Sequence, residues 1–137
     1  MANHLRHLRE ARAVSLLSDF EKVHIGCVLV YNNRVIAAGH NSNKSHTIQM
    51  KYNRYRSLRG HKIEHKIHAE TMAMQKLAHF DIDYRKVVCY NYREGKDGRP
   101  MLSRPCPSCM RMLQDLGIRK VIYSTETEVG WCEERIA

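Results

Sequence analysis

Two short stretches of the sequence hold residues that can bind a metal ion and move a proton beside it. The first is His68-Ala69-Glu70, and the second, further along the chain, is Pro105-Cys106-Pro107-Ser108-Cys109. Together they supply one imidazole, two thiols at an i, i+3 spacing and one carboxylate. Catalytic zinc is held by three protein ligands and keeps a further position open for water. The two stretches therefore predict a zinc site with an open position and a proton-transferring group beside it.

The spacing assigns a role to each of these residues. Cys106 and Cys109 are about one helical turn apart, so they face the same side of a helix start, where the helix dipole favours thiolate. His68, at the start of another helix, is the third ligand. Glu70 is two residues from His68 and points another way on a regular helix, so it is expected beside the zinc-bound water. A structural zinc would need a fourth protein ligand, and Cys89 or Cys132 would reach it only through the fold, so a catalytic zinc is favoured.

The elements that must position these residues follow from hydrophobic periodicity. Residues 4–18 have helical spacing of apolar residues, and two β-rich runs at 25–31 and 35–39, separated by Asn32-Asn33, predict a hairpin with helices on both faces. The later elements are a helix from His68, a strand over 86–92, a helix from Pro105 that ends at Gly117, and a strand over 120–123. For the tail 125–137 the sequence does not decide between a short strand and a helix. His4 and His7 are expected to be solvated on the first helix.

Composition limits the class of protein. The 137 residues suffice for one domain, which we take as 1–137, and the net charge of +9 should attract anions such as nucleotides or nucleic acid. The first ten residues contain no uninterrupted apolar run, so no signal peptide or membrane span is expected and the default location is the cytoplasm. Five cysteines, two of them in a metal-type pair, argue against a disulfide framework. Cys27 and Cys89 lie in apolar runs and are expected to be buried.

A basic insert covers residues 44–67. Its basic residues, with Glu64 as the single acid, are Lys44, Lys51, Arg54, Arg56, Arg59, Lys62 and Lys66. Tyr52 and Tyr55 are interleaved with them. Basic and aromatic side chains together suit a phosphate-bearing or stacking ligand, so Tyr52 and Arg54 are candidate substrate contacts. The alternative is a solvated run of charge.

The two stretches resemble the zinc signature of the cytidine deaminase-like superfamily, H-x-E followed by P-C-x-x-C. The resemblance extends to the hairpin, with Gly26-Cys27-Val28-Leu29-Val30 and Gly39-His40-Asn41, and to 116–123 after the cysteines, so it covers roughly residues 5–123. It implies an α/β protein with the three-layer α/β/α cytidine deaminase-like fold and a central mixed sheet of four or five strands. It also implies one Zn²⁺ per chain.

The resemblance also implies the roles of individual residues. His68, Cys106 and Cys109 bind zinc, and Glu70 takes a proton from the metal-bound water and passes it to the ring nitrogen and then to the leaving ammonia. The hydroxide attacks C4 of a cytosine or C6 of an adenine. The implied substrate contacts are Asn41 at the sugar, Ala69 at the base edge, and Ser103 and Arg104 at the rim.

The motif at 39–41 and the insert look most like the deoxycytidylate deaminase branch, which includes phage-encoded members. The main hypothesis is therefore a zinc-dependent hydrolase that converts cytosine to uracil in a free nucleoside or nucleotide such as dCMP. A second hypothesis is a deaminase of unpaired bases in single-stranded DNA or RNA. The third is a non-catalytic, zinc-stabilised nucleic-acid-binding module, against which Glu70 argues. Analogy with the superfamily implies a homo-oligomer.

Overall fold

The computed structural model describes residues 3–19, 23–42, 68–77, 80–95 and 97–136. The basic insert, with Tyr52 and Arg54, lies outside these ranges. The elements in chain order are α1 (His4–Ser15), β1 (His24–Tyr31), β2 (Arg34–His40), α3 (Ala69–Leu77), a short 3-10 helix η2 (Tyr84–Lys86), β3 (Val88–Glu94), β4 (Pro100–Met101), α4 (Pro107–Leu116), β5 (Lys120–Ser124) and β6 (Trp131–Arg135).

The strands form one mixed sheet in the order β2-β1-β3-β5-β6, with the short β4 paired to β3. The β1 strand is antiparallel to β2 and β3, the β3–β5 pair is parallel, and β6 is antiparallel to β5. The predicted mixed sheet is confirmed. The tail, which the sequence left open, adds the edge strand β6.

The predicted hairpin is β1 and β2. Its two-residue turn has positive φ at both Asn32 (51°) and Asn33 (64°). Asparagine tolerates this left-handed backbone, and a turn of this hand matches the twist of the paired strands. The register shifts between Leu29 and Val30, where a bulge interrupts the pairing with β2.

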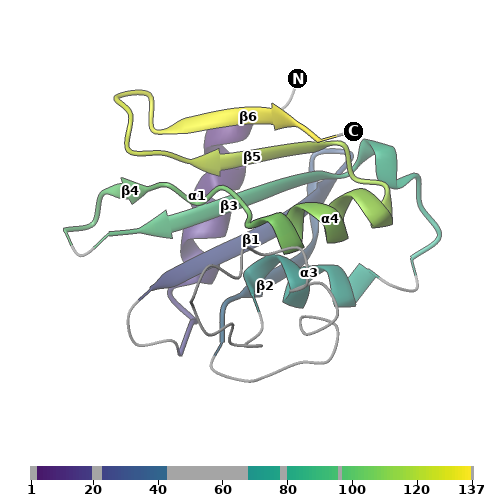
Figure 1. Ribbon diagram of the computed structural model, residues 1–137, viewed down its shortest axis with the longest axis horizontal. Coiled ribbons are helices and arrows are strands. Elements are labelled where there is room, and N and C mark those ends of the chain that lie inside the picture. Colours follow the sequence, from purple (N-terminus) through teal and green to yellow (C-terminus); the bar gives the residue numbers. More distant parts are fainter. Residues whose placement is uncertain (1–2, 20–22, 43–67, 78–79, 96, 137) are drawn as a thin grey trace.

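Helices cover both faces of the sheet, with α1 on one face and α3 and α4 on the other (Figure 1). Alternation along β1 divides the core, because Val28 and Val30 pack with α1 whereas Cys27 and Leu29 pack with α3 and α4. Cys27 and Cys89 are fully buried as expected, and all five cysteines are free. The three-layer α/β/α arrangement is therefore confirmed.

Two glycines let these helices approach the sheet closely. A Cβ on Gly26 would collide with the carbonyl oxygen of Ala11 and the amide of Ser15 in α1. A Cβ on Gly39 would collide with the carbonyl oxygen of Ala69 and the amide of Ala73 in α3. Cys27 pairs with Gly39 and Gly26 with His40, so the two contacts lie side by side in the hairpin but on opposite faces.

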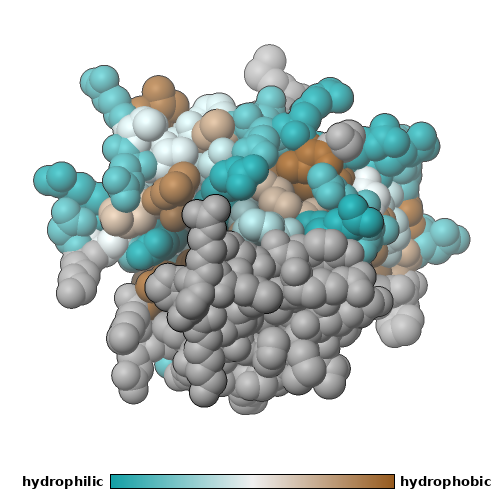
Figure 2. Space-filling model, in the orientation of Figure 1, coloured by the Kyte–Doolittle hydropathy of each residue, from teal (hydrophilic) through white to brown (hydrophobic). Residues whose placement is uncertain are grey.

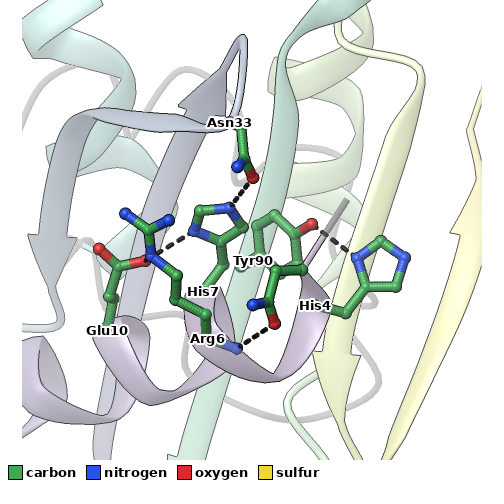
Figure 3. Close-up of polar contacts among 7 residues, drawn as sticks. His4, Arg6, His7, Glu10, Asn33 and Tyr90 are labelled. Atoms are coloured by element: carbon green, nitrogen blue, oxygen red, sulfur yellow. Dashed lines mark hydrogen bonds and ion pairs between the residues drawn. The ribbon is translucent and has the colours of Figure 1, made fainter. Parts of the chain in front are cut away.

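The expectation that His4 and His7 are solvated is wrong. His7 is 1% exposed, with Nδ1 2.6 Å from Glu10 Oε1 and Nε2 2.9 Å from Asn33 Oδ1 (Figure 3). His4 Nδ1 lies 2.7 Å from the Tyr90 hydroxyl, and its ring packs against Tyr90 and Trp131. Because α1 lies flat on the sheet, these polar side chains point under the helix and find partners on the β1–β2 turn and on β3.

One helix boundary differs from the sequence prediction. The α1 helix ends at Ser15 rather than at residue 18. On the face shown in Figure 2, hydrophobic areas are separated by hydrophilic ones. Among the described residues, no helix has the length and apolar character needed to cross a membrane.

Candidate metal centre

The starts of two helices meet at the candidate site. The His68 carbonyl accepts a hydrogen bond from the Met72 amide (3.1 Å), so His68 stands at the N-terminal cap of α3. Cys106 is the N-cap of α4, its carbonyl accepts from the Met110 amide (2.9 Å), and Pro107 occupies the first turn. Because both helices present their positive ends here, the local field favours anionic thiolate ligands.

The three predicted ligands come together. His68 Nδ1 is 3.2 Å from Cys109 Sγ and 3.5 Å from Cys106 Sγ, and one ligand atom from each residue lies within 4.8 Å of the others. Zinc bonds of 2.0–2.1 Å to nitrogen and 2.3 Å to sulfur at tetrahedral angles would place nitrogen and sulfur about 3.6 Å apart. The donor set therefore fits one zinc ion in both chemistry and spacing, and within the described part of the chain no fourth ligand atom belongs to the group.

The two thiols differ in their proton affinity. Hydrogen bonds from Cys109, from His68 and from the Ser108 hydroxyl, at 3.0 Å, lower the pKa of Cys106 to about 3. The hydrogen bond with Cys106 and complete burial raise the pKa of Cys109 well above its usual range. The Cys106 thiol is therefore the more acidic of the two. A divalent cation would bind both sulfurs in their deprotonated form.

Glu70 lies next to these ligands in the first turn of α3. Its side chain is 4% exposed, and burial raises the pKa of its carboxyl group. The carboxyl group shares a hydrogen bond with Cys109 and is close enough to His68 for attraction to oppose the rise. Glu70 is outside the group of mutually close ligand atoms. A buried carboxyl group beside a metal position, but not part of it, is placed to accept and return protons.

Two of the predicted substrate contacts, Asn41 and Ala69, are buried. The Asn41 amide donates to the Val23 carbonyl (2.7 Å) and accepts from the Ile25 amide (3.0 Å), so it fixes the start of β1. Ala69 is buried where α3 crosses Gly39. Contacts from these residues to a substrate stay predictions, as do those of Tyr52 and Arg54 outside the described residues.

Ser103 and Arg104 lie in the segment between β4 and Cys106. The Ser103 hydroxyl is 3.0 Å from the Asn91 carbonyl, to which it donates, and 2.8 Å from the Ser124 hydroxyl. Its carbonyl accepts from the Asn91 side chain (3.3 Å). Arg104 binds Glu134 through Nε and Nη2, each at 2.9 Å. A rim contact of either residue with a substrate stays a prediction.

Sequence reasoning missed the partners of this segment. Asn91 lies in the middle of β3, Ser124 ends β5 and Glu134 lies on β6. All three contact the segment only because of the order of the strands in the sheet. A polar residue inside an apolar run, as at Asn91, is the one signal that was present in the sequence.

Comparisons with known proteins agree with this architecture. The family model of the cytidine and deoxycytidylate deaminase zinc-binding region matches residues 1–125. A search of curated protein sequences finds no significant match.

Several solved structures share the fold. The dCMP deaminase of cyanophage S-TIM5 in its apo form is similar over 91% of this chain and 84% of its own, with a TM-score of 0.62 and 21% identity. The same enzyme in complex with dCMP and dUMP gives a TM-score of 0.63 at 21% identity, over 94% of this chain and 87% of that one. The cytidine deaminase of Burkholderia pseudomallei gives a TM-score of 0.67 at 14% identity, over 98% and 93% of the two chains.

Proposed function

The chain belongs to the cytidine and deoxycytidylate deaminase zinc-binding family, and from that premise we propose that it is a hydrolytic deaminase that converts cytosine to uracil in a free nucleoside or nucleotide such as dCMP. The observation that carries the proposal is the buried Glu70 carboxyl group beside a His68, Cys106 and Cys109 group with zinc-compatible spacing. A structural zinc site is closed by four protein ligands and needs no proton-transferring group beside it.

In this proposal His68, Cys106 and Cys109 hold the zinc ion. Zinc in such a site supplies Lewis acidity, which makes water a better nucleophile near neutral pH. Glu70 takes a proton from the attacking water and delivers it to N3 of the ring. It then takes the second proton, from the hydroxyl group formed at C4, and delivers it to the departing amino group. Water adds at C4, the bond from C4 to the exocyclic nitrogen breaks, and uracil and ammonia are formed. The raised pKa of Glu70 supports this role, because its carboxyl group can both bind and release a proton.

Substrate recognition is the finer part of the proposal. Asn41 follows β2, and Ala69 opens α3 beside the ligand His68, so both lie on the elements that frame the metal position. We assign the sugar to Asn41 and the base edge to Ala69. We assign the phosphate to the basic insert with Tyr52 and Arg54. The net charge of +9 supports an anionic substrate, which is either a free nucleotide or a nucleic acid.

The test is ammonia release by the zinc-loaded protein from cytidine, deoxycytidine, dCMP, dCTP, adenosine and a single-stranded oligonucleotide. Turnover of a free cytosine nucleoside or nucleotide is expected. Turnover of the oligonucleotide alone would instead support a nucleic-acid deaminase, and no turnover of any compound would support a binding module.

Glu70→Gln separates catalysis from metal binding. We expect it to lower kcat/KM by at least about 100-fold, because general acid–base catalysis is lost. It should keep one zinc per chain. Glu128→Gln, on the exposed turn between β5 and β6, makes the same change of charge and should leave the rate unchanged. Full activity in Glu70→Gln would contradict the role of this residue.

A further inference from the structure

The segment that delivers Cys106 to the metal position has a second attachment, on the edge strand of the sheet. Arg104 forms two parallel hydrogen bonds to Glu134, Nε to Oε1 and Nη2 to Oε2, both at 2.9 Å. The Tyr123 hydroxyl donates to Glu134 Oε1 at 3.0 Å. One carboxylate on β6 thus binds one side chain of β5 and one of the ligand-bearing segment.

The ion pair between Arg104 and Glu134 has a more favourable geometry than an ordinary surface ion pair. Exposed pairs contribute little to stability when two long side chains are held by a single contact. Here the guanidinium and the carboxylate meet in the planar two-bond arrangement that fixes orientation as well as distance. The Arg104 side chain is 47% exposed and that of Glu134 is 29% exposed, so the pair is set apart by its geometry rather than by burial. The second donor to Glu134, Tyr123, is largely buried. Arg104 in turn has its charge matched within the chain.

The backbone between Arg104 and Cys106 is stiff, so a movement of Arg104 would also move Cys106. Pro105 and Pro107 stand on either side of Cys106, and each proline ring fixes its own φ. A residue before proline is also restricted to extended conformations. This applies to both Arg104 and Cys106, and the backbone of Cys106 is extended, with φ of −67° and ψ of 165°. The segment therefore has few torsions that can absorb a movement of Arg104 before it reaches the Cys106 sulfur.

The two attachments of this segment act in different directions. Ser103 is tied to β3 and β5 in the interior, through Asn91 and Ser124. Arg104 is tied to β6, one strand further out. With Ser103 alone, the segment could still pivot about its inner anchor, and the outer anchor removes that freedom.

We propose that Arg104 and Glu134 are positioning residues for the zinc ligand Cys106, and that the contact between them sets how tightly the metal is held. This inference rests on the proposed function only in that the metal group is a zinc site. It assigns Arg104 to the metal centre rather than to substrate binding. It also makes β6 a part of the metal centre, although it contributes no ligand.

The test is the rate at which zinc passes from the protein to an excess of a chromogenic chelator. Glu134→Gln should release zinc about tenfold faster than the unmodified chain, because partners that orient metal ligands have effects of this order. Glu128→Gln, with the same change of charge on the same β5–β6 hairpin, should match the unmodified chain. Arg104→Gln should equal Glu134→Gln, and the double variant should be no faster than either, because the two residues act through one contact.

If the ion pair stabilises the fold but does not orient Cys106, its variants would be less stable and would not show this pattern of zinc release rates. If Glu134→Gln does not fold, Tyr123→Phe removes one hydrogen bond to the same carboxylate and should give a smaller acceleration of release.

Zinc release at the unmodified rate from folded Glu134→Gln or Tyr123→Phe would overturn the inference and leave the proposed function intact. Faster release from Glu134→Gln in a chain that deaminates none of the tested compounds would uphold the inference and overturn the proposed function. Failure of the unmodified chain to bind zinc would overturn both.

Discussion

At the scale of single residues, hydrogen bonds in the structure give several side chains a role that their position in the sequence does not indicate. Asn41 illustrates this, because an asparagine after a strand suggests either a turn or a substrate contact. In the structure its amide forms hydrogen bonds with two backbone groups, the Val23 carbonyl just before β1 and the amide of Ile25, the second residue of β1. The sequence indicated that Asn41 has a role at the end of the hairpin. It did not indicate the hydrogen-bond partners of Asn41, because these lie near it only when β1 and β2 are paired.

His4 provides a pH-dependent contribution to stability. Burial lowers the pKa of its imidazole below the usual 6.5, with Lys120 and His7 adding to the effect and Glu133 opposing it. Since the unfolded chain binds this proton more readily, the contribution is fully present above about pH 6.5 and is lost as the pH falls through the lower pKa of the folded state.

The prediction for His4 is tested by unfolding in urea between pH 7.5 and 5. His4→Gln removes the titrating ring, so its free energy of unfolding should fall less steeply on acidification than that of the unmodified chain. His24→Gln, which removes a histidine at the start of β1, is the matched control. Equal slopes for His4→Gln and the unmodified chain would show that the environment of His4 does not perturb its protonation.

At the scale of elements, the position of the metal group depends on how closely α3 lies on β2. Gly39→Ala would place a methyl group against the Ala69 carbonyl and the Ala73 amide, so α3 must move and carry His68 and Glu70 with it. We expect a loss of about 1–3 kcal/mol in the free energy of unfolding, as for other overpacked contacts, together with weaker zinc binding.

Gly26→Ala is the matched control for Gly39→Ala. It collides with α1 on the opposite face, so it should lower stability by a similar amount but leave zinc affinity unchanged. Urea unfolding and chelator competition measure the two effects separately. Equal losses of zinc affinity in the two variants would mean that the sheet transmits the disturbance, and that the contact of α3 is not the cause.

Sequence patterns predicted the elements that depend on local signals. The Asn32-Asn33 turn, the helix from His68, the helix predicted from Pro105, which begins two residues later at Pro107, and its end at Gly117, whose φ is 108°, follow from chemistry within a few residues. The order of strands does not, because β3 pairs with β1 on one side and with β5 on the other. The contacts of Glu134 and the burial of His7 depend on that order.

At the scale of the whole molecule, one zinc ion would join the two helices of one face. His68 precedes α3, and Cys106 and Cys109 belong to the start of α4. An ion that binds only the folded chain raises its stability by mass action, by about 4 kcal/mol when free zinc is at 1,000 times its dissociation constant. Removal of zinc should therefore lower the melting temperature.

Thermal unfolding with and without a chelator measures this difference. His68→Ala removes one ligand, so its melting temperature should respond to the chelator much less. A response in His68→Ala as large as that of the unmodified chain would place the stabilising metal elsewhere.

The distance along the chain between the ligands also decides when the metal can act during folding. His68 and Cys106 are 38 residues apart, and β3, which lies between them in sequence, must pair in parallel with β5. Closing such a loop has an entropy cost that only the assembled sheet offsets. We therefore expect the zinc site to be completed after the transition state for folding. Zinc would accordingly slow the unfolding of the native protein, while the rate at which the chain folds would stay nearly the same.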